Sequence, residues 1–180
     1  MNRLHLAVAL VMLGSGTLSA QRTMPGQIAL SLRGSVFRTS AGLDLGLAQG
    51  LPFGYCSLSV GIDDRRSALS NGESLRYDDI TLTPSVMARL ASTRSRSLCL
   101  YAGAGVLIGC EVCDPMSSLD PNVETGVEGR AFIWGAEPRL ELEWFPLRRT
   151  ALVIDMSAPV TSSRLKAARA RVGLGFRCYL

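Results

Sequence analysis

The sequence predicts an all-β fold, an eight-stranded antiparallel up-and-down outer-membrane β-barrel preceded by a cleaved signal peptide. Three observations lead to this prediction. The chain begins with a basic start, an apolar run and small residues, as a secretory signal does. Several later segments have an apolar residue at every second position, the pattern of a strand with one apolar face. The connections between these segments also alternate in length, as in barrels with short periplasmic turns and longer extracellular loops.

The signal peptide is expected to end near Ala20. Its basic start is Arg3 and its apolar run covers residues 6–13. The predicted cut follows Ala20, and a cut after Ser19 is the alternative because Leu18 is large for its position. The chain then divides into a signal peptide, 1–20, and a transmembrane β-barrel domain, 21–180. A membrane anchor is the disfavoured alternative, since a spanning helix needs about 20 apolar residues.

Composition excludes several functional classes. The chain has 19 Lys and Arg against 15 Asp and Glu, but its arginines are scattered between apolar positions, so we expect no direct binding of nucleic acid. The single histidine, His5, lies in the signal peptide. The mature chain therefore lacks the imidazole that many catalytic and metal sites need. We predict no enzyme activity, no cofactor, no metal and no small-molecule substrate.

Eight strands are expected along the mature chain. They cover residues 27–37, 43–48, 54–62, 77–91, 98–109, 131–145, 150–158 and 168–180. The second is the weakest, because only Leu43, Leu45 and Leu47 alternate in it. Long polar connections, 63–76 and 110–130, follow the third and fifth strands, and short ones follow the second, fourth and sixth. This asymmetry predicts that both termini and the short turns face the periplasm of a Gram-negative cell.

The sixth strand gives the clearest membrane pattern. Trp134 and Trp144 lie on its apolar face about ten residues apart, the length at which a tilted strand crosses the hydrocarbon layer. Membrane interfaces favour aromatic residues at both borders. Pro138 is unfavourable inside a strand, so a bulge is expected there and the register beyond it stays open.

The last strand is expected to close the barrel against the first. Pairing the two removes the open strand edges, which lipid does not tolerate. The terminal alternation also resembles the sorting signal of outer-membrane proteins, so the insertion machinery is an expected partner during assembly. The apolar face of this strand consists of Val172, Leu174, Phe176, Cys178 and Leu180.

The interior of so small a barrel has room only for its own side chains. Carboxylates on the sixth and seventh strands are expected to meet arginines on the first and eighth, because buried charges need partners. The predicted lumen charge network consists of Arg33, Asp44, Glu137, Arg139, Glu141, Glu143, Asp155, Arg171 and Arg177. An acid–base pair of Glu141 and Glu143, as in glycosidases, is disfavoured because such a lumen offers no cleft for a sugar.

Two of the five cysteines stand apart from the strand patterns. Cys56, Cys99 and Cys178 fall within expected strands, whereas Cys110 and Cys113 form the sequence "CEVC" at the start of a polar segment. Redox chemistry would need a thioredoxin-like setting, and zinc would need a second ligand pair. The sequence has neither, so a local loop disulfide between Cys110 and Cys113 is the candidate, and whether the two cysteines are bridged stays open at this point.

Four segments together resemble the conjugative-transposon TraO family of Bacteroidetes outer-membrane proteins. They are "QRTMPGQ", "LYAGAGVLIG", "FIWGAEPRLELEWF" and the terminal "VGLGFRCYL", in this order. The resemblance implies an outer-membrane component of a conjugation apparatus, without catalytic residues, whose partners are outer-membrane lipid and other proteins of that apparatus. The connection 110–129 is acidic and is the expected contact segment, although its acidity would equally keep a loop soluble.

Two other readings of the sequence stay open. An unrelated small barrel of the OmpA/OmpX kind would serve envelope stability or surface adhesion. A soluble periplasmic binding barrel, like a lipocalin, is less favoured because its outward faces would be polar, whereas here they carry Leu, Val, Ile and Trp.

Overall fold

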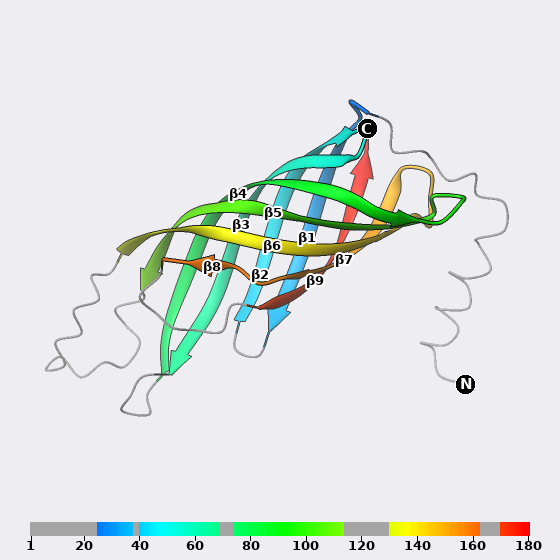
Figure 1. Cartoon of the computed structure of the whole chain (residues 1–180). Coiled ribbons are helices and arrows are strands. Elements are labelled where there is room, and N and C mark those ends of the chain that lie inside the picture. Colours follow the sequence, from blue (N-terminus) through cyan, green and yellow to red (C-terminus); the bar gives the residue numbers. More distant parts are fainter. Residues whose placement is uncertain (1–24, 38–39, 69–73, 114–129, 163–169) are drawn as a thin grey trace, which may run out of the picture.

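The computed structural model describes residues 25–37, 40–68, 74–113, 130–162 and 170–180. The predicted signal peptide lies outside these residues. Within them the chain forms nine strands of one antiparallel sheet (Figure 1). The strands are β1 (Ile28–Phe37), β2 (Ser40–Leu51), β3 (Gly54–Ala68), β4 (Ser74–Ser92), β5 (Leu98–Cys113), β6 (Arg130–Trp144), β7 (Thr150–Ser157), β8 (Val160–Thr161) and β9 (Arg171–Tyr179). No helix in the described part of the chain has the length and apolarity to cross a membrane.

The sheet closes into an eight-stranded barrel, which confirms the predicted fold class. Each strand from β1 to β6 pairs with the strand that follows it in the sequence. Strand β7 also pairs with β9, and β9 pairs with β1 to complete the ring. The short strand β8 prolongs β7, because both pair with β6 in one continuous register. Pro159, which has no N–H to donate, stands between β7 and β8 and interrupts the ladder there.

The barrel wall is apolar outside and polar inside. Outward side chains such as Leu32, Phe132 and Trp134 are 49%, 66% and 62% exposed, whereas the inward Glu137 and Glu141 are fully buried. The burial pattern alternates strictly along β9, and the outward set there is the predicted apolar face that ends at Cys178 and Leu180. This distribution is the reverse of a soluble barrel, in which the apolar face is the buried one.

The long polar connections are shorter than expected. Strand β3 continues to Ala68 and β4 begins at Ser74, so most of the expected connection 63–76 is strand. Strand β5 likewise continues to Cys113. The polar residues there suit a strand because alternate side chains turn inward to charged partners, and outside, Arg76 pairs with Asp64 at 2.9 Å on the neighbouring strand.

The register around Pro138 also differs from the expectation. Strands β5 and β6 pair without interruption from Leu98 to Val112, and Ala104 lies directly opposite Pro138. Pro138 keeps its carbonyl in the ladder by accepting a hydrogen bond from Ala158 N at 3.2 Å. A register shift occurs instead between β4 and β5, at residues 89–91. Strand β2 spans Ser40–Leu51 rather than 43–48, and β9 begins at Arg171 rather than at residue 168.

The two ends of the barrel differ. The turn end holds the connections 52–53, 93–97 and 145–149 together with the C-terminal end of β9 (Figure 1). Backbone hydrogen bonds tie these turns to each other and to the last strand: Phe145 N donates to Ser97 O at 2.8 Å, and Tyr179 N donates to Arg149 O at 2.7 Å. The loop end is the opposite one, where β3 to β6 are the longest strands of the sheet.

Candidate functional site: the charged barrel interior

All nine residues of the predicted lumen charge network lie in the barrel interior, and each is at most 6% exposed. Their positions follow from the alternation of each strand, because residues two apart in sequence share a face. Two clusters, one toward each end, hold most of the charges.

The cluster nearer the turn end is built around Arg177. Its guanidinium donates to Glu141 Oε1 at 2.8 Å and to Glu143 Oε1 at 3.1 Å. It also donates to the Tyr55 hydroxyl at 3.2 Å and stands 4.4 Å from the centroid of the Tyr55 ring. The Tyr179 hydroxyl donates to Glu143 Oε1. One arginine from β9 therefore donates charge-assisted hydrogen bonds to two carboxylates of β6, and two tyrosines make further hydrogen bonds in the cluster.

The cluster nearer the loop end is built around Arg171. This guanidinium donates to Glu137 Oε1 at 2.7 Å and to Asp63 Oδ2 at 2.8 Å, and its Nε donates to Ser157 Oγ at 3.0 Å. Glu137 also pairs with Arg139 at 3.0 Å. The cluster links β3, β6, β7 and β9 across the lumen, so it joins strands that are distant in the chain.

Arg33 lies beside the turn-end cluster. It forms an ion pair with Glu141 at 3.8 Å and interacts electrostatically with Asp44 and Asp155. Within the described residues, neither Asp44 nor Asp155 makes a salt bridge of its own. Both aspartates therefore interact electrostatically with Arg33, and Asp155 also does so with Arg139 and Arg171.

Inward glycines make room for these charged side chains. Gly61 is the cross-strand partner of Asp44, Gly173 that of Asp155, and Gly175 that of Arg33. A Cβ at Gly175 would stand 2.5 Å from Arg33 Cγ, and a Cβ at Gly61 or Gly173 would collide with the aspartate opposite. The glycines opposite Arg33, Asp44 and Asp155 therefore leave room for these three charged side chains in a narrow lumen.

The turn end of the lumen is filled by aromatic and small apolar side chains. The rings of Tyr55 and Tyr101 meet edge to face at 5.2 Å, and those of Phe145 and Tyr179 lie 5.4 Å apart. The cavity left beside Arg177 in this region measures about 10 Å³, room for one water molecule at most. The described side chains are therefore closely packed at the turn end of the lumen.

Sequence reasoning missed a second set of interior charges. Arg65 pairs with Asp79 at 2.9 Å and with Asp63 at 3.2 Å, and all three are buried. Asp63 and Arg65 were expected in a polar connection. The alternation of strand three, continued past Gly61, would have placed both on the inner face.

The predicted loop disulfide is not formed. Cys110 is a free, exposed thiol within β5. The backbone from 110 to 113 is extended and belongs to β5. The physical reason for the error is that β5 continues beyond the expected strand end at residue 109.

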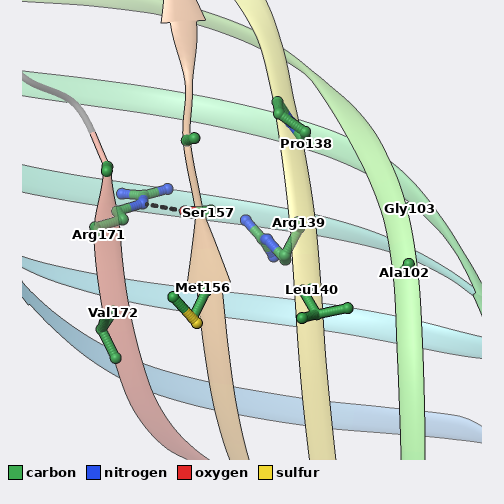
Figure 2. Close-up of a pocket in the computed structure, with 11 residues that line it drawn as sticks. Ala102, Gly103, Pro138, Arg139, Leu140, Met156, Ser157, Arg171 and Val172 are labelled. Carbon is green, nitrogen blue, oxygen red and sulfur yellow. Dashed lines mark hydrogen bonds between the residues drawn. The ribbon is translucent and has the colours of Figure 1, made fainter.

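No group of three potential ligands that could hold a metal ion occurs among the described residues. The outer wall carries a hollow of about 480 Å³ over β5, β6, β7 and β9 (Figure 2). Its outward lining is apolar and includes Pro138, Leu140, Met156 and Val172. Figure 2 shows Arg171 bound to Ser157 beneath it, so the charges at this point are engaged within the protein.

Comparisons with solved structures agree with this architecture. The N-terminal β-barrel domain of Pseudomonas aeruginosa OprF shares 10% identity, with 87% of this chain and 98% of that chain covered and a TM-score of 0.52. Neisserial surface protein A shares 10% identity, with coverage of 84% and 94% and a TM-score of 0.53. The Yersinia pestis attachment invasion locus protein Ail, solved with a heparin analogue, shares 13% identity, with coverage of 87% and 100% and a TM-score of 0.50.

No protein-family model and no curated protein matches the chain. The likeness to the three barrels shows the fold, and at these identities it shows the fold alone.

Proposed function

We propose that this protein is an outer-membrane barrel that anchors and displays its loop-end connections at the cell surface, in the manner of a small OmpA/OmpX-like protein. The observation that carries the proposal is the inverted wall, with an apolar outer face around an interior that holds buried ion pairs and hydrogen-bonded polar side chains. Such an arrangement is stable in lipid, because only a closed barrel leaves no strand edge with unpaired backbone N–H and C=O groups there.

A structural role follows from the packed interior. The lumen holds ion pairs across strands and an aromatic seal at the turn end, so the barrel is a rigid scaffold rather than a channel. Contacts with other molecules would then fall to the connections at the loop end, since binding residues are commonly carried on loops held by rigid frames.

The orientation gives the experiment that tests this function. A protease-cleavable tag inserted in the connection 114–128 should be cut on intact cells, because the longer connections face outward. The same tag at Arg148, in a turn of the opposite end, should be cut only after the outer membrane is opened. Protein recovered in the membrane fraction with both tags equally protected would contradict display at the surface, and soluble periplasmic protein would contradict the membrane barrel.

A role in conjugation is a second candidate, and only the resemblance of the four sequence segments to the TraO family supports it. On this proposal, deleting the gene in a donor strain should lower transfer of the mobile element while growth and envelope integrity stay nearly unchanged. Shortening the connection 114–129 to a tight turn should lower transfer without loss of the barrel. Normal transfer from the deletion strain would remove conjugation from the account and leave the scaffold role.

A further inference from the structure

Arginines gather on two neighbouring turns at the turn end. Arg94 and Arg96 belong to the turn between β4 and β5, and Arg148 and Arg149 belong to the turn between β6 and β7. The hydrogen bond from Phe145 N to Ser97 O joins the two turns. We call these two turns, with their four arginines, the basic turns.

No residue that the structure describes neutralises the charge of the basic turns. Arg94, Arg148 and Arg149 are exposed, Arg96 is half-buried, and none of the four forms an ion pair with a described residue. The three turns 52–53, 93–97 and 145–149 contain no acidic side chain. The exposed Arg76, in contrast, is paired with Asp64 near the loop end. One end of the barrel therefore carries an unpaired positive surface.

The position of the basic turns points to a partner at the membrane border. The outward Trp144 and Leu98 face each other in the last pair of the β5–β6 ladder, and Leu147, 58% exposed, lies next to Arg148. Arg96 is two residues from Leu98 and Arg148 is next to Leu147, so at about 3.3 Å per residue these two arginines stand roughly 3–7 Å beyond the apolar side chains. That depth is the headgroup layer, which adds about 5–8 Å on each side of the hydrocarbon core.

We propose that the basic turns bind the phosphate groups of anionic phospholipids in the leaflet at the turn end. The inference rests on the proposed membrane barrel and goes beyond it by giving one end a lipid preference. A guanidinium binds phosphate through paired, charge-assisted hydrogen bonds, and four of them beside an apolar border concentrate anionic headgroups. An acidic protein partner would reach the arginines from the aqueous side, and it would give the neighbouring Trp144 no lipid preference.

The two tryptophans of the chain provide the probe. Trp144 lies beside the basic turns and Trp134 lies toward the loop end of the same strand. The full protein, purified from membranes with Trp134→Phe, is reconstituted in mixed phosphatidylglycerol and phosphatidylcholine vesicles in which one of the two lipids carries brominated chains. Trp144 fluorescence should be quenched more strongly when phosphatidylglycerol is the brominated lipid than when phosphatidylcholine is. The difference should correspond to an enrichment of phosphatidylglycerol around Trp144 of about fivefold, the effect of one arginine near an anionic surface. The Trp144→Phe protein, which reports from Trp134, should show none.

Matched variants assign the effect to the arginines. Replacing all four by Gln should abolish the preference, replacing them by Lys should retain much of it, and Arg130→Gln at the loop end should change nothing. Salt at about 1 M should also abolish it, since screening then acts within about 3 Å. If the fourfold Gln protein does not fold, the two pairwise Gln variants and the salt series on the unmodified arginines decide the question.

The outcomes separate this inference from the proposed function. Equal quenching of Trp144 by both lipids in a protein that inserts normally would overturn lipid binding and leave the membrane barrel intact. An equal preference at Trp134 would also overturn it, because the turns would not be the source. Failure to insert into either kind of vesicle would overturn the membrane barrel, and the inference with it.

Discussion

Replacing Arg177 by Met is expected to lower the free energy of unfolding by about 3–5 kcal/mol, because it leaves buried carboxylates without their cation. Glu141 and Glu143 are both fully buried, and Arg177 is the residue that donates hydrogen bonds to each of them. Methionine keeps much of the side-chain length, so the loss comes chiefly from the charge. The measurement is the urea concentration at which half of the protein in lipid vesicles is unfolded. Folded and unfolded protein are distinguished by the shift of gel mobility that heating causes.

Two comparisons isolate the effect of Arg177. Arg76→Met breaks an ion pair of similar length, 2.9 Å, that is exposed to solvent, and should cost at most about 1 kcal/mol. Adding Glu143→Gln to Arg177→Met should recover part of the stability, since Glu143 then carries no unpaired charge and Glu141 keeps its ion pair with Arg33. Equal effects of Arg177→Met and Arg76→Met would contradict the described interior cluster.

Leu140→Arg is expected to lower stability in the membrane by about 2–4 kcal/mol, because a charge would enter the middle of the lipid-facing band. Leu140 points outward from the centre of β6, between the two inward residues Arg139 and Glu141. A shift of one residue would exchange every inward and outward side chain of the strand. The same urea titration in vesicles measures the effect and tests the register of β6.

A residue at a shallower depth in the membrane provides the control for Leu140→Arg. Leu147 is also exposed and apolar, but it lies in the turn between β6 and β7 at the end of the barrel. Leu147→Arg should therefore cost no more than about 1 kcal/mol, as expected near an interface. If Leu140→Arg were as stable as the unmodified protein, the outward face of β6 would not face lipid.

The fold was predictable because its decisive signal is local. Alternation in the sixth and last strands assigns Trp134, Phe176 and their neighbours to one face without any knowledge of the partner strands. Closure then follows from the cost of an open edge in lipid. The inward position of Glu137 and Arg177 was predictable for the same reason.

The partners of each charge were not predictable, because they depend on register and on positions across the lumen. That Arg171 meets Asp63 follows from the tilt and closure of strands more than 100 residues apart in the chain. The strand ends were predicted wrongly where both faces of a strand are polar. Asp63 and Arg65 fit the sequence pattern of a polar loop unless their inward charged partners are known. Pro138 was expected to break the register, but its carbonyl still accepts a ladder hydrogen bond.

Closure of the barrel in the membrane is the central claim, and one native cysteine allows a direct test. Cys178 on β9 is a free thiol and lies opposite Leu30 on β1. Partners in such a ladder have Cα atoms about 5.5 Å apart, within the range that a disulfide spans. In a chain whose other cysteines are Ser, Leu30→Cys should form a bridge with Cys178 when isolated membranes are oxidised, and Val36→Cys, at the far end of β1, should not. A folded, membrane-bound Leu30→Cys protein that fails to bridge would contradict the closed barrel.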